Sequence, residues 1–258
     1  MVKESPDGES KLAVYIDFEN IALGFEYQHR KERFDIQKVL ARFLEKGRIL
    51  IKKAYADWGR YDMYKQQLHE AGIELIDIPK RRQTGKNSAD IRLCVDALAH
   101  AYSNPHIDTF VIVSGDSDFT PLVYKLRENA KSVIGLGMKG STADLLIDSC
   151  DEFIYYEDLE RPAPSPAPIP DNVPQIRRDA ISHLIEAVTA MMRENIPVLH
   201  SSHIKETIKR KRPQFDESYH GYRSFSELLE HAQELGLLKL STDPRSGTYV
   251  VSRLSSPR

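Results

Sequence analysis

Acidic side chains follow two apolar segments that have the composition of buried strands. Asp17 comes after residues 12–16 (LAVYI), and Asp116 comes after residues 109–113 (TFVIV). In an open α/β sheet, ligands bind in the crevice beyond the carboxyl ends of the strands, so carboxylates at these positions face a site and not the core. A charged residue at the end of a buried apolar strand is uncommon unless it has a function. We therefore expect both aspartates to be functional.

Three further polar residues accompany this pair. Asn20 follows Asp17 in the segment DFEN, Asp118 follows Asp116 in SGDSDF, and Asp90 lies in the first turn of an expected helix. Asp90 and Asp118 also have a structural interpretation, because an acid at a helix start caps the helix or interacts with its dipole. Both interpretations stay open for these two residues.

The combined residue types indicate metal chemistry. Several converging carboxylates without a His or Cys cluster are the ligand set of a hard divalent cation such as Mg²⁺ or Mn²⁺. Like charges repel unless a cation neutralises them, and such a cation can activate water for phosphodiester hydrolysis. Ser114 and Ser117 have no His/Asp partner in the local sequence, so we expect them to hydrogen-bond to carboxylates or phosphate and not to act in acyl transfer.

The elements that must position these residues alternate between apolar runs and amphipathic stretches. Strands are expected at residues 12–16, 49–55, 73–78, 109–113 and 132–137, and helices at 34–47, 60–72, 88–102, 118–130 and 141–150. Near-continuous Val, Ile and Leu runs suit strands that are buried on both faces. The pattern predicts an α/β domain over residues 11–160, with a mostly parallel sheet between helices.

A second domain follows a proline-rich segment. Residues 161–174 contain six of the 14 prolines, which predicts an extended linker over 161–175. Over residues 176–255, helices are expected at 179–195, 200–211 and 224–236, followed by two strands within 237–254. Three helices and a hairpin indicate a small α+β domain of the winged-helix type.

Composition places the chain in a broad class. Its 258 residues are 41% hydrophobic and carry a formal net charge of −2, which excludes a disordered chain and gives no global basic field. No apolar stretch reaches the length of a membrane span, and the first residues lack the pattern of a secretory signal. Cys94 and Cys150 are expected to be reduced, buried thiols. These features favour a cytoplasmic protein without a membrane partner.

Three segments resemble the signature segments of the NYN domain, in their order and approximate spacing: YIDFEN at 15–20, KNSADIRLCVDAL at 86–98 and VSGDSDFTPLV at 113–123. That family is a branch of the PIN-like metal-dependent ribonucleases, and the resemblance covers about residues 11–158. It implies a three-layer α/β/α domain. It also implies roles for five residues: Asp17, Asp90 and Asp116 as metal-binding carboxylates, Asn20 as a polar partner and Asp118 as a further acid.

The C-terminal part is similar to the LOTUS domain, also called OST-HTH, a winged-helix RNA-binding module. The resemblance covers residues 177–254 and rests on the order of the elements and on the segment from Tyr219 to Leu229. It implies RNA, with single-stranded regions, as the partner. Because winged helices also bind DNA, the preference for RNA comes from this resemblance and not from the basic residues.

Basic and aromatic residues supply candidate RNA contacts. Those in the loop before Asp90 are Lys80, Arg81, Arg82 and Lys86, and those in the tail are Lys209, Arg210, Lys211, Arg212, Tyr222 and Arg223. The alternatives are an ordinary solvated loop and, for Tyr222, packing inside the small domain. Trp58 has the same two readings, base stacking or packing.

The function predicted from these observations is a metal-dependent ribonuclease, most simply an endonuclease, whose C-terminal domain selects or holds RNA. Two alternatives stay open, a non-catalytic RNA-binding adaptor and a phosphohydrolase of nucleotides. The sequence leaves the RNA target, the base preference, the preferred ion and the oligomeric state, monomer or homodimer, undecided.

Overall fold

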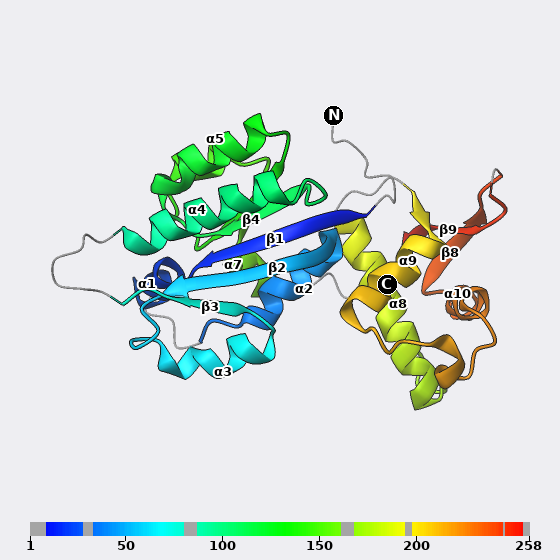
Figure 1. The fold of residues 1–258 in the computed structure, drawn as a ribbon. Coiled ribbons are helices and arrows are strands. Elements are labelled where there is room, and N and C mark those ends of the chain that lie inside the picture. The colour runs from blue at the N-terminus through cyan, green and yellow to red at the C-terminus, as the bar shows by residue number, and fades with distance from the viewer. Residues whose placement is uncertain are drawn as a thin grey trace. The chain divides into compact units, whose positions relative to one another are not determined.

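A computed structural model of the chain describes residues 9–27, 33–79, 87–160, 168–193, 198–244 and 246–254 (Figure 1). The chain divides into two units. The first comprises Met1–Phe43 and Gly47–Arg161, and the second comprises Leu44–Lys46 and Pro162–Arg258. Each unit is described by itself.

Six parallel strands form the sheet of the first unit, in the order β3-β2-β1-β4-β5-β6. They are β1 (Ser10–Asp17), β2 (Gly47–Ala56), β3 (Glu74–Asp77), β4 (Thr109–Val113), β5 (Ser132–Gly137) and β6 (Glu152–Tyr155). The chain adds β2 and β3 on one side of β1 and then returns to place β4 on its other side. The carboxyl ends of β1 and β4 therefore form the topological switch point of the sheet, which is where such folds bind ligands.

Helices cover both faces of this sheet. They are α1 (Phe18–Tyr27), α2 (Ile36–Lys46), α3 (Asp62–Glu70), α4 (Ser88–Ser103), η1 (Ser117–Phe119), α5 (Thr120–Glu128), α6 (Asp144–Ser149) and α7 (Tyr156–Glu160). Figure 1 shows α4 and α5 on one side of the strands and α2 and α3 on the other. This arrangement confirms the predicted α/β class and its parallel sheet.

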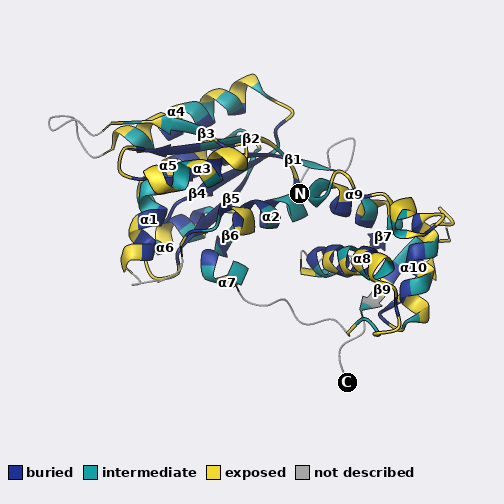
Figure 2. Ribbon diagram, turned by 90° about the horizontal axis from the view of Figure 1, so that it is seen from below, coloured by how far each residue is buried: buried dark blue, intermediate teal, exposed yellow. Residues whose placement is uncertain are grey.

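The side chains of β1 explain why the strand reads as a continuous apolar run. Leu12, Val14 and Ile16 point into the core under α1 to α3, whereas Ala13 and Tyr15 point into the core under α4 to α6. Successive strand residues face opposite sides, so a strand covered on both faces needs apolar residues at every position. Figure 2 shows the strands buried between partly exposed helices.

In the part of the second unit that the structure describes, the elements are α8 (Gln175–Arg193), β7 (Leu199–His200), α9 (Ser201–Lys211), η2 (Glu217–His220), α10 (Phe225–Glu234), β8 (Leu238–Thr242) and β9 (Tyr249–Leu254). The strands form an antiparallel sheet in the order β7-β9-β8. A capping box starts α10, because the Glu227 amide donates to Ser224 Oγ over 3.2 Å and the Arg223 amide donates to the Glu227 carboxylate over 2.6 Å.

Several short elements were not predicted. The structure adds α1, β6 and α7 in the first unit and β7 and η2 in the second. The two cysteines are free thiols, Cys94 within α4 and Cys150 at the end of α6. Within the described residues, no helix has the length and apolar character needed to cross a membrane.

Candidate functional site

The site is built from the adjacent ends of β1 and β4. Ile16 pairs with Val113 in the parallel ladder, so the residues that follow these two positions leave the sheet side by side. Asp17 is the last residue of β1, and Asp116 caps η1 after β4. The structure thus places the two aspartates at the same edge of the sheet.

Asp17 is deeply buried for an acid, with only 5% of its surface exposed. The Ser114 hydroxyl donates to Asp17 Oδ2 over 2.9 Å, and the backbone amide of Asn20 donates to Asp17 Oδ1 over 3.2 Å. Both donors are neutral, so they satisfy the carboxylate oxygens without compensating a charge.

Burial raises the pKa of Asp17 from its ordinary 3.8 to about 7. The Asn20 amide and the Ser114 hydroxyl lower this pKa, whereas the charges of Asp90 and Asp116 raise it further. The influence of both acids on Asp17 means that the three carboxyl groups share one local field. Binding of a cation among them would relieve the repulsion and favour the ionised form of Asp17.

A chain of hydrogen bonds joins the two strand ends. The Gly115 amide donates to Asn20 Oδ1 over 2.8 Å, and the Asp116 amide donates to Ser114 Oγ over 3.2 Å. Gly115 also packs closely, because a Cβ there would lie 2.9 Å from Thr142 Cα. Asn20 and Ser114 therefore fix the loop that carries Asp116 relative to Asp17.

The remaining predicted acids lie at the start of neighbouring helices. The Asp118 amide donates to Asp116 Oδ1 over 2.9 Å, and Asn87 Nδ2 lies 3.5 Å from Asp118 Oδ2. Asp118 is exposed, and Asp90 is half-buried in the first turn of α4. The side chain that caps η1 is thus Asp116 and not Asp118, which leaves the Asp118 carboxylate facing solvent.

The donor set fits a hard divalent cation in kind, since carboxylate oxygens dominate it and one acid is buried beside two others. Within the described ranges, no three or more His, Cys, Asp or Glu side chains are arranged as a ready-made metal cluster.

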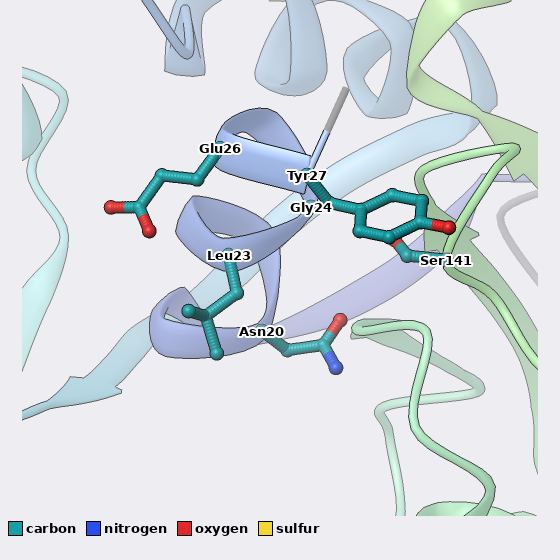
Figure 3. Close-up of a pocket in the computed structure, with 6 residues that line it drawn as sticks. All are labelled: Asn20, Leu23, Gly24, Glu26, Tyr27 and Ser141. Atoms are coloured by element: carbon teal, nitrogen blue, oxygen red, sulfur yellow. The ribbon is translucent and has the colours of Figure 1, made fainter. Parts of the chain in front are cut away.

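A hollow of about 400 Å³ beside the site was not foreseen from the sequence. It lies along α1 and is lined by Asn20, Leu23, Gly24, Glu26, Tyr27 and Ser141 (Figure 3). The signal that could have found it is the segment IALGFEY, whose apolar residues recur at helical spacing directly after the first strand.

The predicted basic residues give a mixed outcome. Lys80, Arg81, Arg82 and Lys86 lie outside the described residues. In the second unit, Lys211 and Arg212 form ion pairs with Glu186, at 3.0 and 2.9 Å. Arg210 Nη2 donates to Thr207 Oγ1 over 2.8 Å.

Lys209 and Arg223 are exposed, whereas Tyr222 is only 2% exposed. The Tyr222 hydroxyl shares a 2.7 Å hydrogen bond with His231 Nδ1, and the Arg177 guanidinium lies 4.9 Å from the ring centroid. Tyr222 therefore packs within its unit, and its ring is not available to stack on a base. Trp58 is likewise buried, with its indole donating to the Ile76 carbonyl over 3.0 Å.

Comparisons with known proteins bear on the first unit. The chain is 30% identical over 163 residues to an uncharacterized protein of Methanocaldococcus jannaschii, covering 60% of this chain but only 62% of that relative's length. The crystal structure of a protein of unknown function from Vibrio parahaemolyticus is 25% identical and superposes with a TM-score of 0.52, over 60% of this chain and 98% of that one.

A family model gives the assignment. The model of the NYN domain matches residues 11–159, which span the six-stranded sheet and all the acids of the site. The matched region is more than half of the chain. The chain therefore belongs to the NYN domain family, whose members are generally nucleases.

Proposed function

We propose that this protein is a metal-dependent ribonuclease that hydrolyses RNA phosphodiesters within the strand. The observation that carries the proposal is the buried Asp17 carboxyl at the switch point, held by neutral donors in the field of Asp90 and Asp116. A buried carboxyl group near two other acids is explained if the three acids together bind a cation.

Asp17, Asp90 and Asp116 would hold the ion, Mg²⁺ or Mn²⁺. When bound, the ion would supply an activated water and stabilise the charge that develops on the phosphate. Ser114 and the Asn20 amide keep the Asp17 carboxylate oriented by donating to its two oxygens. The exposed Asp118 carboxylate can accept a hydrogen bond from the attacking water and so orient it.

The second unit is proposed to be a LOTUS-like winged-helix domain that holds RNA. Support comes from its α8, α9 and α10 helices and its small antiparallel sheet. Lys209 and Arg223 are exposed and could contact phosphates. The proline-rich residues 161–175 would tether this domain, and so raise the effective concentration of bound RNA near the acids.

The experiment is incubation of the full chain with a labelled, partly single-stranded RNA in Mn²⁺, Mg²⁺ or EDTA. We expect metal-dependent internal cleavage that Asp116→Asn abolishes. The matched control is Asp62→Asn on α3, whose side chain is 82% exposed, and it should cleave like the original chain. Binding of RNA without cleavage in any metal would contradict the nuclease proposal and favour a non-catalytic adaptor. Turnover of mononucleotides without cleavage of RNA would favour a phosphohydrolase.

A further inference from the structure

The hollow on α1 shares one residue, Asn20, with the network around the acids. Asn20 lines it and also accepts a hydrogen bond from the Gly115 amide in the loop that carries Asp116. Asn20 is also the residue whose amide donates to Asp17. Asn20 thus belongs both to the lining of the hollow and to the hydrogen-bond network that holds the proposed catalytic acids.

Two large hydrophobic residues that line the hollow, both on α1, are exposed. The Tyr27 side chain is 73% exposed and that of Leu23 is 53% exposed. Tyr27 lies seven residues beyond Asn20, which corresponds to about 10 Å along a helix. An exposed aromatic ring at this distance from a reactive centre can contact a neighbouring part of the same substrate.

At Gly24, which lines the hollow, α1 packs closely against the loop after β5. A Cβ on Gly24 would lie 2.7 Å from Met138 Cγ and 2.9 Å from Ser141 Oγ. Only a residue without a side chain allows this packing, which brings the Ser141 hydroxyl beside the helix. Figure 3 shows Asn20 and Tyr27 projecting toward the side of Ser141, and Glu26 pointing the other way.

We propose that this hollow binds an unpaired base of the RNA, next to the nucleotide whose phosphate is cleaved, with the Tyr27 ring stacking on the base. This inference rests on the proposed ribonuclease function and adds to it a binding site for one base beside the cleaved bond. Leu23 is the aliphatic residue of the lining that would contact the base or sugar, and the side-chain amide of Asn20 and the hydroxyl of Ser141 are its neutral polar groups.

The chemistry of the lining favours a base over a phosphate. Among the described residues that line the hollow there is no Lys or Arg to attract a phosphate, and the one charged residue is the acid Glu26. A neutral, flat heterocycle suits a lining of one exposed ring, one aliphatic side chain and two neutral polar groups. Because a paired base has its faces covered by its neighbours in the stack, only an unpaired base can lie on Tyr27.

The test measures binding of a fluorescent single-stranded RNA to the full chain in EDTA, where cleavage does not interfere. Tyr27→Ala should weaken binding roughly five- to hundredfold, the range found for removing one aromatic ring from a base. Tyr27→Phe keeps the ring and should bind like the original chain. The matched control is Tyr124→Ala on α5, another exposed tyrosine, which should change nothing.

A double-mutant cycle locates the contact. Abasic sites are introduced one at a time along the RNA, and one position next to the cleaved bond should weaken binding to the original chain but not to Tyr27→Ala. Additive effects at every position would overturn the subsite. The same RNA as a perfect duplex should bind Tyr27→Ala and the original chain equally.

The outcomes separate this inference from the nuclease proposal. Metal-dependent cleavage combined with unchanged RNA binding by Tyr27→Ala refutes the subsite and leaves the nuclease. Binding that depends on Tyr27, in a chain that never cleaves RNA, supports the subsite and refutes the nuclease. A chain that binds no RNA refutes both.

Discussion

Asp17 and Asp96 are two aspartates of the first unit with opposite surroundings. Asp96, on α4, accepts hydrogen bonds from the Tyr55 hydroxyl at 2.9 Å and from Arg92 Nε at 3.0 Å, and it lies 3.8 Å from Lys53 Nζ. The donors that the structure describes around Asp17 are one amide and one hydroxyl. The described surroundings of Asp96 therefore compensate its charge, whereas the two neutral donors at Asp17 do not compensate a charge there.

Replacing Asp17 and Asp96 one at a time should have the largest effect on the difference between them. Asp17→Asn should lower the rate of RNA cleavage at least about a hundredfold, since even residues that only orient metal ligands are worth 10- to 100-fold. Asp96→Asn should leave the rate unchanged at a temperature where it is folded. Cleavage assays in Mn²⁺, with folding checked by circular dichroism, compare the two. Equal loss in both variants would show that the difference between them is not functional.

A second prediction uses pH. Because the pKa of Asp17 is raised to about 7 in the folded chain, its protonated form stabilises the metal-free fold. That contribution is fully present below about pH 4 and is lost as the pH rises through about 7, at roughly 1.4 kcal/mol per pH unit.

Urea unfolding in EDTA between pH 4 and 8 measures this loss as the difference between the original chain and Asp17→Asn. Subtraction of the variant removes the contributions of the other titrating groups. Saturating Mn²⁺ at pH 8 should restore stability to the original chain and much less to the variant. A difference between the two chains that does not change with pH would contradict the burial of an uncompensated acid.

The third prediction concerns stability without function. Asp96→Asn should lower the free energy of unfolding by about 1 to 3 kcal/mol, because Arg92 loses its charged partner and the Tyr55 hydroxyl a charged acceptor. Chemical unfolding at neutral pH measures the change. A change near zero would mean that Arg92 and Tyr55 do not compensate the charge of Asp96.

The smallest effect is expected from removing a hydrogen-bond donor of Asp17. Ser114→Ala removes the donor to Asp17 Oδ2 and the acceptor of the Asp116 amide, at a cost of about 1 kcal/mol in stability. Affinity for Mn²⁺, measured by calorimetry, should fall roughly tenfold. Unchanged affinity would show that the carboxylate keeps its orientation without the hydroxyl.

Much of the first unit could be predicted from local patterns. The strands β1, β2, β4 and β5 are apolar runs, and the helices α2 to α5 have helical spacing, so each gives its own signal. Helix α1 was missed because it begins at Phe18, directly after β1 and without a turn between them. Strand β6 was not predicted, although it is as long as β3, which was predicted within residues 73–78.

Properties that depend on distant partners could not be predicted. Asp17 and Asp116 were placed correctly at one edge, but the pKa of Asp17 depends on burial by the whole sheet. Lys211 and Arg212 look like RNA contacts in the sequence, yet both pair with Glu186 on another helix. Tyr222 looks like a stacking residue, but tertiary packing buries it.

The position of β1 has a consequence for synthesis of the protein. This first strand lies in the middle of the sheet and pairs with β4, and Asp116 comes 99 residues after Asp17 in the chain. Such long-range parallel pairing forms late, since distant segments must meet before any contact is gained. A growing chain on the ribosome therefore holds its acids apart until β4 has emerged and docked.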